Sequence, residues 1–193
     1  INNYNISVQI GNYVAVQDTF LKNNDVHLMN HYVLDYNKEL ASNFFPQSKE
    51  VIRFYEKYFG DYQWYDDGYK LVEVPYLGME HQSAVTYGNG FSMYNGVRSK
   101  SWPMYGVIDP LIIHETGHEW FGNSVTASDP THIWIHEGLQ VYSESIYFED
   151  KFKSYEVGVH YLNTIKNRIA NEIPIVGNEN ENHWALHGDT YMK

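Results

Sequence analysis

Cysteine is absent from this chain of 193 residues, so it has no disulfide framework and no thiolate metal ligand. Any metal ion must therefore be held by His, Asp or Glu side chains. Long apolar runs are also missing: no stretch of about 18 such residues occurs, and we expect no membrane span.

Basic residues are few, since 13 Lys and Arg stand against 24 Asp and Glu, and the net charge is −11. Phosphate backbones are bound by positive surfaces, so this charge disfavours a nucleic-acid partner. An acidic surface mostly serves solubility, although it also suits cationic ligands. The length and the hydrophobic share of 43% allow one packed domain, or one domain plus part of another.

The opening third is typical of β-structure. Apolar and polar residues alternate over residues 4–10, and this period of two predicts a half-buried strand. Gly11-Asn12 predicts a turn, and residues 13–16 a second strand. A further strand is expected over residues 26–34.

The character of the chain changes near residue 37. Pro46, then apolar residues at helical spacing over residues 51–59, then Gly60 together predict an amphipathic helix. Residues 69–76 and 84–87 are expected to be strands.

Two Asp-Pro pairs predict helix starts, with Asp as the N-cap and Pro at the first helical position. Asp109-Pro110 predicts a helix that runs to about Phe121, and Asp129-Pro130 one over residues 132–148. A third helix is expected over residues 154–170.

Another helix start is suggested by Gly188-Asp189-Thr190, but the sequence stops at Lys193. One turn behind a cap is too short to be stable alone. We therefore expect the last element to be cut and the sequence to be an excerpt of a longer protein.

The first Asp-Pro helix carries His114-Glu115-Thr116-Gly117-His118. Residues four apart share a helix face, so the two imidazoles can converge on one ion. Glu115 lies one position further round, within reach of a metal-bound water but not placed as a third ligand. In a chain with 10 His, a chance match to this pattern has a probability of roughly a few per cent, so the motif alone does not decide the function.

Glu137 is the candidate third ligand, and 18 residues separate it from His118. Catalytic zinc commonly takes three protein ligands and leaves the fourth position open. Two His and one Glu suit zinc better than magnesium or calcium, which prefer oxygen ligands. The alternative for Glu137 is an exposed helical carboxylate.

Three further residues are candidates for orienting the metal ligands rather than for binding the metal. Glu119, Glu144 and His136 could orient the ligands, although a solvated helix face also explains the two carboxylates. No ligand spacing exists for the other histidines, which we expect to be surface or core residues: His27, His31, His160, His183 and His187.

The motif His114-Glu115-Thr116-Gly117-His118, followed by Glu137 at this spacing, resembles the zinc site of the gluzincin aminopeptidases of the aminopeptidase N type. Two further segments support the resemblance. Leu77-Gly78-Met79-Glu80-His81 resembles the family's Gly-x-Met-Glu-Asn exopeptidase signature, and Tyr191-Met192-Lys193 resembles the start of its Tyr-x-Lys-Gly segment. Leu77 and His81 depart from the signature, which is expected to alter side-chain preference or anchoring.

The resemblance implies an α+β fold. Residues 37–193 would form a thermolysin-like catalytic domain, cut at its C-terminal end, in which a mixed sheet accompanies the helices that carry the zinc ligands. Residues 1–36 would be the end of a preceding β-rich domain. One zinc ion per chain would be held by His114, His118 and Glu137, with Glu115 as the catalytic base.

The implied activity is hydrolysis of the N-terminal peptide bond of peptides with a free N-terminus. Glu80 would bind the α-amino group, the backbone of Gly78 and Met79 would run alongside the peptide, and Tyr191 would stabilise the oxyanion. Three alternatives stay open: a thermolysin-type endopeptidase, an epoxide hydrolase of the same family, and an inactive truncated fragment that binds metal or peptide. Oligomeric state, compartment and preferred side chain are not indicated.

Overall fold

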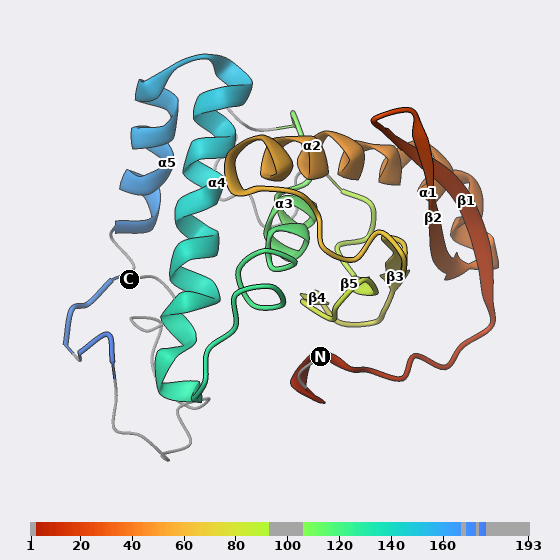
Figure 1. The fold of residues 1–193 in the computed structure, drawn as a ribbon, viewed down its shortest axis with the longest axis horizontal. Coiled ribbons are helices and arrows are strands. Elements are labelled where there is room, and N and C mark those ends of the chain that lie inside the picture. Colours follow the sequence, from red (N-terminus) through yellow and green to blue (C-terminus); the bar gives the residue numbers. More distant parts are fainter. Residues whose placement is uncertain (1–2, 93–105, 167–168, 173, 177–193) are drawn as a thin grey trace. The chain divides into compact units, whose positions relative to one another are not determined.

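The computed structural model describes residues 3–92, 106–166, 169–172 and 174–176 (Figure 1). The chain forms two compact units, residues 1–119 and 120–193. The fold is α+β with a mixed sheet, as predicted. Within the described ranges, no helix has the length and apolar character that a membrane span requires. The expected helix start at residues 188–190 and the candidate Tyr191 lie outside the described residues.

A sheet of five strands forms the frame of the first unit, in the order β1-β2-β3-β5-β4. β2 and β3 pair in parallel, as do β3 and β5, whereas β1–β2 and β4–β5 are antiparallel. The strands are β1 (Tyr13–Lys22), β2 (Asp25–Leu34), β3 (Leu71–Glu73), β4 (Gly78–Met79) and β5 (Val85–Tyr87).

The helices of the first unit include two short 3-10 turns around α1. The elements are η1 (Asn3–Asn5), η2 (Asp35–Asn37), α1 (Lys38–Phe44), η3 (Phe45–Gln47), α2 (Ser48–Phe59) and α3 (Pro110–Gly117). As predicted, α2 is amphipathic, burying Val51, Ile52 and Tyr55, and it ends at Gly60, whose φ is +92°. Pro46 lies just before it, in η3.

α3 packs in the core of this unit, against α2. Ile112 and Ile113 are fully buried on it. The Tyr69 hydroxyl lies 2.6 Å from Thr116 Oγ1, and both side chains are buried. α3 is therefore held by apolar packing and by a polar contact from the loop that leads into β3.

The N-terminal end of α3 is fixed by Asp109. Its carboxylate accepts hydrogen bonds from Leu111 N–H (2.8 Å), Asn89 Nδ2 (2.9 Å) and the Tyr87 hydroxyl (2.6 Å). The Asp109 N–H donates to Gln47 Oε1 at 2.7 Å. Burial raises the pKa of this carboxyl to about 6. The N-cap predicted from sequence is thus the centre of a buried network that reaches β5 and η3.

The second unit consists of η4 (Pro130–Ile135), α4 (Glu137–Phe152) and α5 (Tyr155–Lys166). α4 and α5 pack against each other, with Tyr147, Phe148 and Tyr161 buried. The Asp129 side chain accepts a hydrogen bond from Thr131 N–H at 2.9 Å, so the second Asp-Pro pair also caps a helix.

Several expected boundaries were wrong. Residues 6–10 form no strand, and Val8 and Ile10 are 80% and 91% exposed. Alternation marks a face, but a strand also needs a partner, and none pairs with this segment in the part of the chain that the structure describes. α3 ends at Gly117 rather than near Phe121. The expected helix over residues 132–148 is divided into η4 and α4, and α4 extends to Phe152.

His31 is a core residue. It is fully buried on β2, and its Nδ1 accepts a hydrogen bond from Leu71 N–H at 3.0 Å. β2 and β3 share a single registered pair, so this bond adds to a short pairing. Burial lowers the pKa of the imidazole to about 4; the charges of Asp18 and Lys49 have smaller, opposing effects.

We expect this histidine to make stability depend on pH. As the pH falls below about 6.5, His31 becomes protonated in the unfolded chain, whereas in the folded chain it stays neutral until about pH 4. The free energy of unfolding therefore decreases between pH 6.5 and 4, by up to about 3 kcal/mol. Urea unfolding across this range measures the loss. His31→Gln keeps a hydrogen-bond acceptor but cannot titrate. The slope of its unfolding free energy against pH should therefore be smaller, by the equivalent of about one proton taken up on unfolding. Equal slopes would contradict the assignment.

The cap of α3 should matter more than that of η4. Asp109→Ala leaves three buried donors without their acceptor, which should cost about 3 kcal/mol of unfolding free energy. Asp129→Ala removes the same kind of cap at a half-buried site and should cost about 1 kcal/mol. Chemical denaturation of the pair checks this order; a reversed order would show that the Asp109 network is not stabilising.

Candidate metal centre

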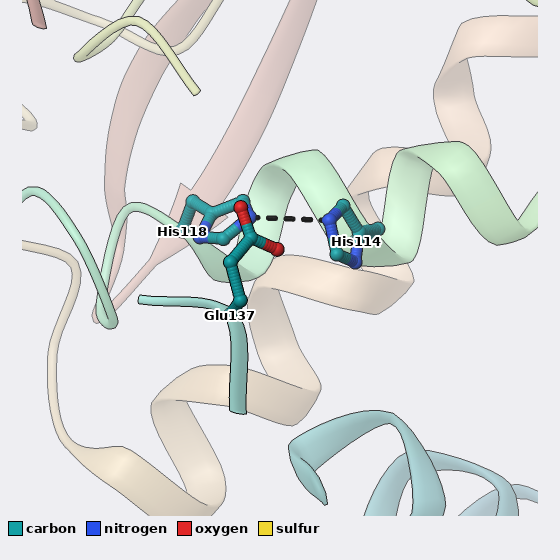
Figure 2. A group of neighbouring side chains, drawn as sticks. All are labelled: His114, His118 and Glu137. Atoms are coloured by element: carbon teal, nitrogen blue, oxygen red, sulfur yellow. Dashed lines mark hydrogen bonds between the residues drawn. The ribbon is translucent and has the colours of Figure 1, made fainter. Parts of the chain in front are cut away.

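The two imidazoles of α3 face each other (Figure 2). His114 Nε2 and His118 Nε2 lie 3.2 Å apart, with the ring planes at 88°. Two nitrogens that bind a tetrahedral zinc ion at about 2.0–2.1 Å are about 3.4 Å apart. The pair therefore fits one zinc ion with little adjustment. His118 is fully buried and His114 half-buried.

Glu115 is 7% exposed and lies against β4. A Cβ atom built at Gly78 would come 2.6 Å from Glu115 Oε1, closer than atoms can approach. Gly78 thus leaves the room that the carboxylate occupies. Glu115 and the Gly78–Met79 segment, both predicted as site residues, therefore lie side by side in the first unit.

Glu80 lies at the same place, 3% exposed. Its Oε2 is 3.6 Å from His118 Nε2. Glu80, Glu115 and His118 each present a ligand atom, and these atoms lie within 4.8 Å of one another. Three buried titratable groups thus share one small volume of the first unit.

The first residues of the chain reach this cluster. The Tyr4 hydroxyl donates to Glu80 Oε1 at 3.3 Å, and Gln82 N–H donates to Asn5 O at 3.2 Å. Sequence reasoning missed Tyr4, because a tyrosine in an alternating segment carries no signal of a polar contact 76 residues away.

The signature strand itself is held by its neighbour. Met79 O accepts from Thr86 Oγ1 at 3.1 Å, and Gly88 N–H donates to Leu77 O at 2.7 Å. His81 follows the strand, where its N–H donates to Met79 O at 3.0 Å. Burial lowers the pKa of the His81 imidazole, which favours its neutral form.

The carboxylate next to the histidine motif has a structural contact. Glu119 is buried, and its Oε1 accepts from Ser83 N–H at 2.6 Å. It therefore fastens the loop after the signature strand to the end of α3.

In the second unit, Glu137 is the first residue of α4 and is half-buried. It is the residue that the sequence pattern predicts as the third ligand. His136, just before it, is buried and accepts from Ala127 N–H at 2.9 Å through Nε2, so it fixes a loop of its own unit. Glu144, further along α4, accepts from the Tyr161 hydroxyl.

Known proteins with similar sequences are aminopeptidases. Endoplasmic reticulum aminopeptidase 2 of Homo sapiens is 30% identical over 140 residues, which cover 66% of this chain and 14% of that protein. Aminopeptidase B of Rattus norvegicus is 34% identical over 91 residues, covering 46% and 12%. The chain therefore spans about an eighth of the length of these relatives.

A similar fold occurs in the M1 zinc metallopeptidase from Deinococcus radiodurans. The TM-score is 0.58 at 17% identity, over 84% of this chain and 33% of that one. A variant of that peptidase, crystallised with a Tyr-Ser-Ala substrate, gives the same TM-score over 81% and 32%. At this identity the likeness concerns the fold alone.

The model of the Peptidase family M1 domain matches residues 45–182. This segment is well over half of the chain, and it contains β4, α3 and the whole of α4. The chain belongs to peptidase family M1.

Proposed function

We propose that this chain carries the catalytic site of a zinc-dependent aminopeptidase, which hydrolyses the N-terminal peptide bond of peptides. One observation carries the proposal: the buried carboxylate of Glu80, which directly follows β4, lies beside the His118 imidazole and beside the candidate base Glu115. Family membership and relatives named aminopeptidases support the same reading.

His114, His118 and Glu137 are the proposed ligands of one zinc ion per chain. The nitrogen separation of 3.2 Å supports the first two. Glu137 is supported by its place in the sequence, with 18 residues between it and His118, and by the donor set, since two imidazoles and one carboxylate suit catalytic zinc. Zinc, when bound, lowers the pKa of a water molecule towards neutrality and polarises a peptide carbonyl.

Glu115 is the proposed general base. It accepts a proton from the attacking water and later delivers it to the leaving amine. The contact with Gly78 supports this role, because it keeps the carboxylate beside the strand along which the substrate backbone would run. Gly78 and Met79 would contact the peptide through their backbone groups.

Glu80 is the proposed anchor of the substrate's α-amino group. A buried carboxylate is stabilised by a cationic partner, which a free α-amino group supplies and a blocked N-terminus does not. This preference distinguishes an aminopeptidase from an endopeptidase with the same zinc ligands. Tyr191 would donate a hydrogen bond to the oxyanion, a contribution typically of about 3–4 kcal/mol.

The finer architecture belongs to the same proposal. Residues 37–193 would form a thermolysin-like catalytic domain, and residues 1–36 the end of a β-rich domain. The mixed sheet that precedes α3 supports a gluzincin arrangement, since it places a substrate-binding strand next to the metal helix.

The assignment of the base predicts a separation of metal binding from turnover. Glu115→Gln should keep one zinc per chain but lower kcat by about 10²–10⁴-fold, because the amide cannot accept the proton. Metal analysis and hydrolysis of an aminoacyl fluorogenic substrate measure the two properties. Glu39→Gln, the same change at an exposed site, is the control and should leave both unchanged. Undiminished turnover in the Glu115 variant would refute the role.

The amine anchor predicts a preference for unblocked peptides. A peptide with a free N-terminus should be cleaved far faster than its N-acetylated form, and Glu80→Ala should reduce kcat/KM for the free peptide by about 10²-fold. The acetylated peptide serves as the internal control, because it offers no charge to Glu80. Equal rates on both peptides in the unsubstituted protein would eliminate the aminopeptidase function and favour an endopeptidase.

A further inference from the structure

We propose a second, alternative position for a divalent metal ion, held by Glu80, Glu115 and His118 within the first unit. In the proposed function, Glu80 and Glu115 bind the substrate amine and the attacking water, and neither is a zinc ligand. This position shares His118 with the proposed zinc site but uses neither His114 nor Glu137.

The geometry of the cluster supports an ion. One ligand atom from each residue lies within 4.8 Å of the other two. Some point is then within about 2.8 Å of all three atoms, against metal–ligand distances of about 2.0–2.2 Å. Small rotations of the two carboxylates close this difference. The Glu115 carboxylate lies directly beside the backbone of Gly78, two residues before Glu80, because a Cβ atom at Gly78 would come 2.6 Å from its Oε1.

The electrostatics of the cluster support a cation. Glu80, Glu115 and His118 are 3%, 7% and 0% exposed. Two carboxylates that are buried together repel each other and lose their hydration, and a cation between them offsets both costs. A substrate ammonium group does this at Glu80 during turnover. A metal ion bound by both carboxylates and by the His118 imidazole would offset the negative charge of the whole cluster.

The two metal positions exclude each other. His118 Nε2 lies 3.2 Å from His114 Nε2 and 3.6 Å from Glu80 Oε2, and one imidazole nitrogen binds one ion. An ion on the carboxylate side occupies both the base and the amine anchor, so this position is inactive. Two carboxylates and one imidazole accept oxygen-preferring metals such as Mn²⁺ more readily than the two-histidine set does.

Two variants on α3 test the proposal with metal binding as the readout. His114→Ala removes a ligand of the zinc site only, whereas His118→Ala removes a ligand of both positions. Mn²⁺, followed by the loss of its free EPR signal, should bind His114→Ala at one ion per chain. Binding to His118→Ala should be at least tenfold weaker. Circular dichroism establishes that both variants are folded.

A third variant keeps the test valid if His118→Ala does not fold. Glu80→Gln, added to His114→Ala, preserves shape but removes one ligand charge, and it should weaken Mn²⁺ binding at least tenfold. Failure of His114→Ala to bind Mn²⁺, or binding that Glu80→Gln leaves unchanged, would overturn the alternative position. Neither result would contradict the proposed function, which is tested separately by zinc binding and turnover of the unsubstituted protein.

Discussion

The Asp109 carboxylate holds the N-terminal end of α3 inside the first unit, and the candidate chemistry of that unit depends on this attachment. A short helix has little stability of its own, so tertiary contacts must fix it. The network of Tyr87, Asn89 and Gln47 does so at one end, and the contact between Tyr69 and Thr116 does so near the other. His114 and Glu115 lie between these points, and His118 follows as the C-cap residue of α3.

Burial then sets the electrostatic character of the site. Water is largely excluded from Glu80, Glu115 and His118, so charges there interact strongly with one another. Such a group responds to a cation that enters, whether an ammonium group or a metal ion. The proposed anchoring of the substrate and the proposed alternative metal position thus use the same carboxylates.

Local signals predicted the elements best. The Asp-Pro pairs located the starts of α3 and η4, and the Pro46–Gly60 pattern located α2, because caps and amphipathic faces are encoded over a few residues. The histidine pair of the candidate site was recognised through the same locality, since His114 and His118 are four residues apart, and the roles of the site residues stay predictions. Contacts between segments far apart in the sequence could not be predicted from local patterns. The hydrogen bond from Tyr4 to Glu80 is one example. Residues 6–10 are another, because their alternation predicted a strand but no partner strand lies beside them in the part of the chain that the structure describes.

Gly78 shows how one position can depend on another far away in the chain. Its backbone is extended, so conformation alone does not demand glycine there; the carboxylate of residue 115 does. A methyl group at 78 would displace the side chain at 115 from its present position, because it would lie 2.6 Å from Oε1 and 3.0 Å from Cγ and Cδ. A redesign of the strand therefore also alters the acid on the helix, although the two residues are 37 positions apart in the sequence.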